Sequence, residues 1–231
     1  MSRAQLLAPG VRRIATSSRD AAFLVEGEDG LTLVDVGWAS AHRPLLTAIE
    51  EIGHKPHDVK RIVLTHAHPD HVQGAAYVRE LTGAAILAHP AEHAWLAAGH
   101  VPREGRSGTV GRMLDRLPKL HWKPFTPDQP LNGGERVDGT GLLAIHTPGH
   151  SPGHLAFLHE PTGTVLVGDA VFHRGGLTCG PAALAADPGL RAGSLRRLPP
   201  DISAVGFAHG PALTRTDEVE AFHAWLESLP E

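Results

Sequence analysis

The sequence contains Thr65-His66-Ala67-His68-Pro69-Asp70-His71, a stretch that places four potential metal ligands within six positions. It follows the apolar run Arg61-Ile62-Val63-Leu64, which is typical of a short buried strand. In an extended backbone, side chains two residues apart point to the same side, so the first two histidines can contact one ion. The proline then ends the strand, and the turned backbone beyond it directs the aspartate and the third histidine to another point. One short segment can therefore serve two neighbouring metal positions.

The residue types in this stretch favour a metal site over a chance cluster. Chance is the alternative, because the chain has 17 histidines. Imidazole nitrogens and carboxylate oxygens are, however, the ligands that suit zinc and neighbouring divalent ions. The stretch also lies at a predicted strand-to-helix junction, where α/β proteins usually bind their ligands.

Composition limits the classes of partner. The chain has 231 residues and a formal charge of -4, and it contains no run of Lys and Arg. We therefore expect a small-molecule substrate, no nucleic acid and no membrane as partners, and composition leaves a homo-oligomer open. The start of the chain has too short an apolar run for a secretory signal, and no run reaches the roughly 18 apolar residues of a membrane span. Cys179 is the single cysteine, so an intramolecular disulfide is excluded, and we expect a cytoplasmic protein.

Strands and helices alternate along most of the chain, which indicates a layered α/β fold. Three closely spaced strands are predicted first, with turns short enough for antiparallel hairpins. The predicted strands are 11–15, 21–26, 31–36, 61–64, 84–88, 133–137, 141–145, 155–159, 164–167 and 202–207. The predicted helices are 38–52, 70–81, 91–98, 187–198 and 216–229.

The metal-ligand stretch resembles the H-x-H-x-D-H signature of the metallo-β-lactamase superfamily. Further segments resemble the remaining family motifs in the same order, over residues from about 20 to 225: Val34–Gly37, Thr147–Gly153, Val167–Asp169 and Ala208–Pro211. The resemblance implies one domain over residues 1–231. Its fold would be α/β, a four-layer αββα sandwich of two mixed β-sheets flanked by helices, with the metal site along one edge.

The resemblance also implies the ligand sets. One ion would be held by His66, His68 and His150, and the other by Asp70, His71 and His209. Asp169 would bridge the two ions. Two divalent ions fit this set chemically, because two aspartates and a bridging hydroxide balance charge that neutral imidazoles leave unbalanced. We expect Zn²⁺, while iron and manganese stay open, because these ligands accept several metals.

Three further residues are predicted to lie around the metals. Asp35 ends its strand near the site in relatives and would accept a hydrogen bond from a metal-bound histidine. His154 stands where many relatives have a small polar residue, and it has either a structural role or a contact with the substrate. His173 follows the bridging position closely and has the same two readings.

The resemblance implies hydrolysis by hydroxide that two metals hold, with Asp70 as the catalytic carboxylate that orients the water or passes its proton on. Asp169 at the bridging position resembles glyoxalase II, lactonases and related esterases. The chain ends 22 residues after His209 (231 − 209), so we expect no glyoxalase II extension. The predicted substrate is therefore an ester, a lactone or a thioester without a more specific identity.

Three alternatives accompany this hypothesis. Persulfide dioxygenases share the fold and bind one iron, here through residues that match His66, His150 and Asp169. A binding or scaffold protein with an inactive site is the second. The third is a serine hydrolase, since Gly149–Gly153 matches Gly-x-Ser-x-Gly. The residue after that serine is Pro152, which has no backbone N–H for an oxyanion hole.

Residues 99–130 interrupt the pattern, because they are rich in proline and glycine and yet apolar. We predict that this segment is a flap whose apolar residues line the entrance to the metal site and favour an apolar acyl group. The alternative is a segment that covers ordinary core. The candidates for the entrance are Met113, Leu117, Trp122 and Phe125.

Overall fold

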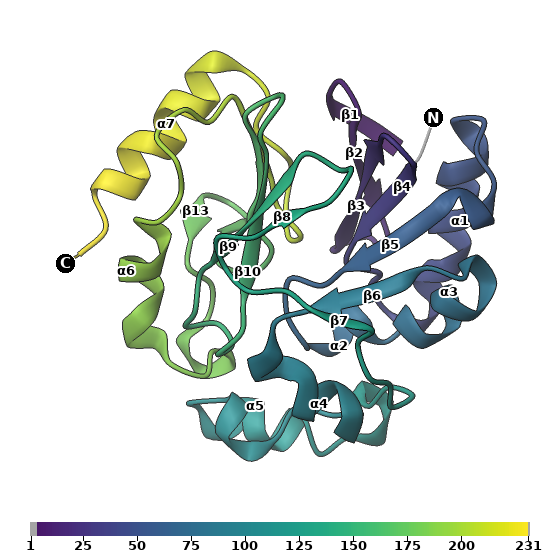
Figure 1. The fold of residues 1–231 in the computed structure, drawn as a ribbon. Helices are drawn as coiled ribbons and strands as arrows, with labels where there is room; N and C mark the ends of the chain where they lie inside the picture. Colours follow the sequence, from purple (N-terminus) through teal and green to yellow (C-terminus); the bar gives the residue numbers. More distant parts are fainter. Residues whose placement is uncertain (1–3, 231) are drawn as a thin grey trace.

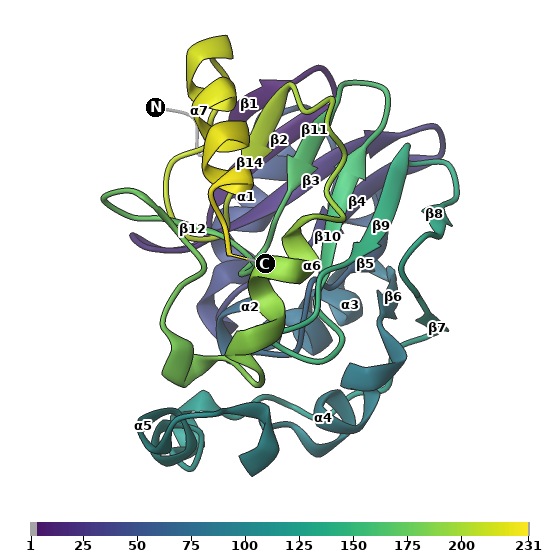
Figure 2. The ribbon, with the colours of Figure 1, turned by 90° about the vertical axis from the view of Figure 1, so that its left-hand side faces the viewer.

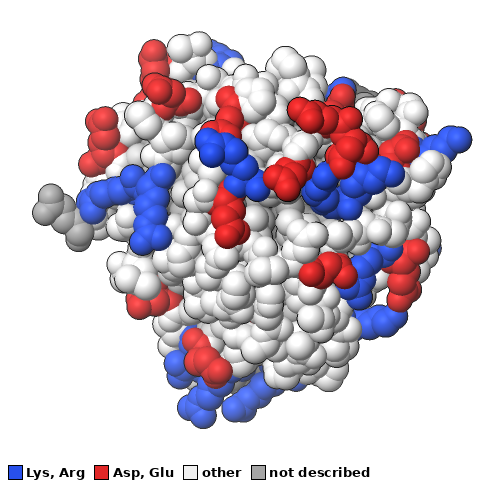
Figure 3. Space-filling model, in the orientation of Figure 1, with Lys and Arg blue, Asp and Glu red and all other residues white. Residues whose placement is uncertain are grey.

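The computed structural model describes residues 4–230 and has four layers. Two β-sheets pack face to face, and helices cover their outer faces (Figure 1). This arrangement confirms the predicted α/β four-layer sandwich. Basic and acidic side chains are interspersed on the face drawn in Figure 3, as the small net charge of -4 leads one to expect.

The first sheet has its seven strands in chain order, from β1 to β7. The first four pair antiparallel, as the closely spaced turns predicted, and β5, β6 and β7 continue the sheet in parallel. The first strand was not predicted. The strands are β1 Ala4–Ala8, β2 Val11–Ala15, β3 Ala21–Gly27, β4 Gly30–Val34, β5 Val59–Val63, β6 Ala85–Ala88 and β7 Gln129–Pro130.

The second sheet has the strand order β14-β11-β10-β9-β8. All neighbours pair antiparallel except β11 and β14, which are parallel. A separate two-stranded hairpin, β12 with β13, follows β11 in the chain. The strands are β8 Arg136–Val137, β9 Leu142–His146, β10 Leu155–His159, β11 Thr164–Leu166, β12 Phe172–His173, β13 Leu177–Thr178 and β14 Ala204–Gly206.

The helices cover the two outer faces and one end of the sandwich (Figures 1 and 2). The first sheet carries α1 (His42–Glu51) and α3 (Ala75–Thr82), and the second carries α6 (Arg191–Leu195) and α7 (Thr216–Glu227). At one end lie α2 (Pro69–Val72), α4 (His93–Ala98) and α5 (Thr109–Leu114). None of the helices in the described residues is both long and apolar enough to cross a bilayer.

The predicted helix 70–81 is interrupted, because Gly74 makes contacts outside the helix. Its amide donates to the carbonyl of Gly37 at 3.0 Å. A Cβ at Gly74 would lie 3.0 Å from Cγ1 of Val36 and 3.1 Å from the carbonyl oxygen of Trp38. The chain therefore turns at this glycine, and α2 ends before α3 begins.

Three apolar layers separate the four structural layers. Successive side chains along a strand point alternately into the two layers on either side of its sheet. On β3, Ala22 and Leu24 pack toward the helices of the first sheet, while Phe23 packs between the sheets. On β10, Phe157 packs between the sheets and Ala156 packs toward the helices of the second sheet. Both sheets therefore present one face to the central layer and one to helices.

All the predicted metal ligands lie in segments that follow strand ends, and two of them, Asp70 and His71, are in the short helix α2. The stretch 65–71 follows β5, His150 follows β9, Asp169 follows β11, and His209 follows β14. Residues from both sheets thus meet at one edge of the sandwich.

The close approach of the two sheets at Gly206 gives a first prediction. A Cβ at this position would lie 2.5 Å from the ring of Phe23 and 2.8 Å from a methyl of Leu166. Gly206→Ala should therefore lower the free energy of unfolding by about 1–3 kcal/mol, as overpacked cores do. Urea denaturation of wild type and variant measures this difference.

Gly193→Ala is the matched control, because Gly193 lies in α6 and a Cβ there meets nothing within 4 Å. It should leave stability unchanged or raise it by up to about 1 kcal/mol, because alanine favours helix. Equal destabilisation by the two substitutions would contradict the packing argument.

Candidate metal site

The structure brings all seven predicted ligand residues together in two adjacent groups. The first group contains His66, His68 and His150, and all three are buried. The second group contains Asp70, His71, Asp169 and His209. Within each group, one potential ligand atom from each residue lies within 4.8 Å of the others.

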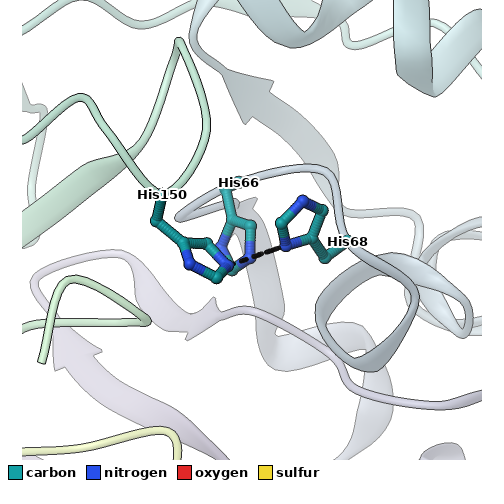
Figure 4. Close-up of side chains that lie close together, drawn as sticks. All are labelled: His66, His68 and His150. Atoms are coloured by element: carbon teal, nitrogen blue, oxygen red, sulfur yellow. Dashed lines mark hydrogen bonds between the residues drawn. The ribbon is translucent and has the colours of Figure 1, made fainter. Parts of the chain in front are cut away.

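The three histidines of the first group converge on one point (Figure 4). Nδ1 of His68 lies 2.9 Å from Nε2 of His66 and 2.8 Å from Nε2 of His150. The three rings meet edge to face, with interplanar angles of 73° to 89°. Three nitrogens presented from different directions suit a tetrahedral ion that keeps one position open.

Asp169 lies between the two groups. Its Oδ2 is 3.3 Å from Nε2 of His150 in the first group. Its Oδ1 is 3.1 Å from Nε2 of both His71 and His209 in the second group. Asp70 is the other carboxylate of the second group, and its Oδ2 is 3.3 Å from Nε2 of His209. The Asp169 carboxylate thus faces both groups, as a bridging ligand does.

The two groups differ in charge in the metal-free protein. Burial lowers the pKa of His66 and His68 well below its usual range, and it lowers the pKa of His150 to about 3. These three imidazoles are therefore neutral, which is the form that binds metal. Burial alone would also lower the pKa of His209, but the charge of Asp169 outweighs it and raises that pKa to about 12.

Nε2 of His71 and Oδ1 of Asp169 are buried and lie 3.1 Å apart, but neither has a partner with the geometry of a hydrogen bond among the described residues. Buried polar atoms are usually paired, because leaving one unpaired costs free energy. A cation would accept lone pairs from both atoms. The donor set, imidazole and carboxylate, also suits divalent ions, so the residues fit such ions at both groups.

Residues behind the ligands fix their orientation. Asp35 accepts hydrogen bonds from Nδ1 of His71 at 2.7 Å and from the hydroxyl of Thr65 at 2.7 Å. Nδ1 of His209 lies 3.0 Å from Oδ1 of Asp20. In both histidines, Nε2 is thereby the nitrogen that faces the other candidate ligands. Asp35 therefore lies where it was predicted, and Asp20 is an equivalent residue that the sequence analysis missed.

His154 supports Asp169 and does not line the cavity above the ligands. Its Nε2 accepts a hydrogen bond from the backbone N–H of Asp169 at 3.0 Å, and its Nδ1 lies 2.8 Å from the hydroxyl of Thr147. Burial lowers the pKa of His154 well below its usual range, so the ring is neutral and Nε2 can accept. Of the two predicted readings, these contacts favour the structural one.

Glu92 joins the two loops that carry the first group. Its side chain accepts hydrogen bonds from the backbone N–H of Ala67 at 3.0 Å and of Gly153 at 2.7 Å. The hydroxyl of Ser151 donates to the same carboxylate at 2.6 Å. Ser151 is fully buried and pairs with an acid instead of a histidine base, which argues against the serine hydrolase alternative.

A cavity of about 770 Å³ opens above the two groups, and its apolar wall differs from the prediction. The apolar lining residues are Trp38, Phe172, Pro181 and Leu184. None of Met113, Leu117, Trp122 and Phe125 lines it.

The prediction for these four residues was therefore wrong. Trp122 and Phe125 are 5% exposed and pack in the core with Leu96. Met113 and Leu117 are exposed on the surface. From residues 99–130, Arg106 is the side chain that lines the cavity, and Asp115 neutralises it through hydrogen bonds of 2.8 and 3.1 Å.

His173 does not line this cavity. Its Nδ1 donates to the carbonyl of Pro211 at 2.8 Å, and the ring packs against Phe207. It lines a neighbouring cleft instead, together with Arg174 and Pro211. Sequence reasoning missed the site-lining residues Trp38 and Phe172, because neither stands in a motif.

Comparisons with known proteins agree with this geometry. The sequence profile of the Metallo-beta-lactamase superfamily matches residues 20–209. The uncharacterised protein YobT of Bacillus subtilis is 35% identical over 157 residues, which cover 67% of this chain and 63% of that protein. A probable metallo-hydrolase of Mycobacterium tuberculosis is 32% identical over 182 residues, which cover 67% of this chain and 57% of that protein. The chain thus spans about three fifths of the length of these two relatives.

Relatives with a stated activity and solved structures extend the comparison. The hydroxyacylglutathione hydrolase GloC of Haemophilus influenzae is 27% identical and covers 70% of this chain and 71% of its own. A metallo-beta-lactamase family protein of Thermus thermophilus superposes with a TM-score of 0.71 at 25% identity, over 96% of this chain and 81% of its own. The subclass B3 metallo-beta-lactamase BJP-1 of Bradyrhizobium japonicum also superposes with a TM-score of 0.71. The match covers 97% of this chain and 90% of that protein, and at 20% identity it shows a similar fold only.

The contact between Asp20 and His209 generates a second prediction. Asp20→Ala should lower metal affinity at the second group about 10–100-fold, because residues that orient metal-bound histidines typically contribute that much. Metal content after dialysis against a graded metal buffer measures this affinity. Asp217→Ala, at an exposed ion pair with Arg215, is the control and should retain wild-type affinity. Unchanged metal content in the Asp20 variant would refute the orienting role.

Proposed function

This chain belongs to the metallo-beta-lactamase superfamily, and on that premise we propose that it is a metal-dependent hydrolase of carboxylic esters, lactones or thioesters with an apolar acyl part. The observation that carries the proposal is the position of Asp169. Its two carboxylate oxygens face the two ligand groups, at 3.3 Å on one side and 3.1 Å on the other. This geometry supports two divalent ions at adjacent positions.

The residues that would hold the ions are the two groups with Asp169 shared between them. Zn²⁺ suits the imidazole and carboxylate donors best, and iron or manganese would be accepted by the same atoms. When bound, two such ions polarise a carbonyl and lower the pKa of water, so that a nucleophile is available near neutral pH.

Asp70 is the proposed catalytic carboxylate. It lines the cavity, and its side chain is 23% exposed, whereas Asp169 beside it is 4% exposed. A carboxylate with access to the cavity can orient the attacking water and take its proton. In the overall reaction, the bond between the acyl carbon and the leaving oxygen or sulfur breaks. Water adds OH to the acyl group, and its other proton goes to the alcohol or thiol.

The apolar wall supports an acyl group as the recognised part of the substrate. Phe172 stacks on the ring of His209, with centroids 4.7 Å apart and an interplanar angle of 9°. Trp38 is fixed by a 2.8 Å hydrogen bond from its indole N–H to Asp20. Both side chains are therefore held beside the ligands, where an apolar acyl chain would displace water from them. The thioester option is supported by the hydroxyacylglutathione hydrolases among the relatives.

The third prediction concerns the bridging residue. Asp169→Ala should lower hydrolysis of an activated ester or thioester by at least about 10²-fold and should reduce the metal content of the purified protein, because two ions lose a shared ligand. Elemental analysis and initial rates measure both effects. His57→Ala, at an exposed histidine, is the matched control. A variant that keeps both ions and full activity would refute the bridging role.

Metal content also separates the proposal from its main alternative. Protein purified without chelator should carry two divalent ions per chain, and chelation followed by metal addition should abolish and restore hydrolysis. One iron per chain together with persulfide-dependent oxygen consumption would favour the dioxygenase-like oxidoreductase instead.

The fourth prediction concerns the apolar wall. For p-nitrophenyl esters from acetate to hexanoate, kcat/KM should rise by up to about fourfold per methylene, since a buried methylene contributes about 0.8 kcal/mol. Leu184→Ser should reduce this dependence on chain length. Leu190→Ser, at a residue that is 51% exposed and does not line the cavity, should preserve it. A flat dependence in wild type would exclude recognition of an apolar acyl chain.

A further inference from the structure

A second cleft, of about 580 Å³, adjoins the metal cavity and has a different character. Four residues line both spaces: Ser17, Ser18, Arg19 and Arg174. The floor of the cleft is formed by β1 and β2, through Gln5 and Arg13. The remaining lining residues are Ala15, His173, Gly175, Gly210 and Pro211.

The lining of the second cleft carries three arginines and, among the described residues, no acid. Nη2 of Arg174 donates to the carbonyl of Arg19 at 2.6 Å, and it lies 3.1 Å from Nδ1 of His209 and 3.6 Å from Asp20, on the side of the metal cavity. Within residues 4–230, the Arg19 guanidinium forms no hydrogen bond or ion pair. The cleft therefore holds a concentrated positive charge in a chain whose net charge is -4.

Arg13 shows most clearly that this charge lacks a partner. It faces the cleft from the middle of β2, and its Nε is buried without a hydrogen-bond partner in the described part of the chain. Burial also lowers the pKa of the Arg13 guanidinium, and no recorded carboxylate offsets that effect. A buried donor without an acceptor costs free energy, which a bound anion would recover.

The neighbouring residue on the same strand behaves differently. Arg12 faces the opposite side of β2, and its guanidinium pairs with Glu26 at 3.1 Å. Since both residues are arginines on one strand, the missing partner of Arg13 is a property of the cleft and not of the strand.

We propose that this arginine cleft, built from Arg13, Arg19 and Arg174, is a subsite for a multiply charged anionic group of the phosphate class on the substrate. Guanidinium groups bind phosphate oxygens through paired hydrogen bonds, and several of them together match a group that carries more than one negative charge. Arg19 and Arg174 line both the cleft and the metal cavity, so a substrate bound at the metal site would have its leaving part next to the cleft. The apolar wall would take the acyl part and the arginine cleft the leaving part.

This proposal rests on the proposed hydrolysis, and the first test uses that reaction. Two thioesters with the same hexanoyl group are compared, one of coenzyme A, which carries phosphates, and one of N-acetylcysteamine, which is uncharged. Wild type should prefer the coenzyme A thioester. Arg13→Gln should lower kcat/KM for it about tenfold or more, mainly through KM, as expected for the loss of a charge-assisted hydrogen bond.

The control variant and the uncharged substrate make this test specific. Arg13→Gln should leave kcat/KM for the N-acetylcysteamine thioester unchanged, and Arg12→Gln should leave both substrates unchanged. Equal losses on both substrates, equal effects of the two variants, or no preference in wild type would overturn the subsite.

A second measurement does not depend on catalysis. Binding of inorganic pyrophosphate to protein stripped of metal by a chelator, measured by calorimetry, reports the arginine cleft without interference from metal-bound phosphate. Wild type and Arg12→Gln should bind, and Arg13→Gln should bind at least about tenfold more weakly. If neither thioester is hydrolysed but this pattern holds, the proposed reaction fails and the anion subsite stands. If pyrophosphate does not bind, or binds all three proteins equally, the subsite is refuted.

Discussion

The buried carboxylate of Asp169 is the constraint on which the rest of this site depends. A carboxylate with 4% side-chain exposure is costly unless positive charge surrounds it. Burial raises its pKa, but the charges of His209 and His71 outweigh that effect and hold the pKa well below its usual range. The aspartate is therefore ionised, and the imidazoles around it are fixed in turn by Asp35 and Asp20. Asp169 is therefore connected through His71 and His209 to two further carboxylates, those of Asp35 and Asp20.

A close backbone contact beside Asp169 completes this arrangement. Gly168, which precedes the carboxylate, adopts a φ of +52°, and a Cβ there would lie 2.8 Å from Nε2 of His154. The histidine can approach the backbone N–H of Asp169 only because that position has no side chain. Glu92 performs a comparable role on the other side, where it holds the loops of His66 and His150 at a fixed separation.

The candidate metal ligands could be found from the sequence in two ways. The alternation of side chains in an extended segment pointed to His66 and His68, and the resemblance to family motifs supplied Asp169 and His209, which follow β11 and β14. Asp20 and Glu92 could not be found in this way. Asp20 lies in a serine-rich turn, where aspartate is common for local reasons, and its partner His209 is far along the chain. Glu92 is an acid in a helical segment, and only the packed fold shows that it is buried.

The apolar segment 99–130 shows a different limit. Its large side chains fit a pocket wall and a core equally well, because both are apolar environments. Packing decides between the two environments. The indole N–H of Trp122 donates to the carbonyl of Leu96 at 3.3 Å, which holds the ring against α4. The break between α2 and α3 is likewise set by a contact of Gly74 with Gly37, which is invisible in a helical pattern.

The origin of the ligands has a consequence for the molecule as a whole. Each group combines side chains from the first sheet, between residues 66 and 71, with side chains from the second sheet, between residues 150 and 209. An ion at either position would therefore cross-link the two halves of the chain, in addition to their apolar packing and to hydrogen bonds such as those of Glu92 to both loops. Because such a link forms only when both sheets are in place, its binding free energy adds to the free energy of folding. The tolerance of this protein to heat or to a core substitution would then follow the supply of metal in its surroundings.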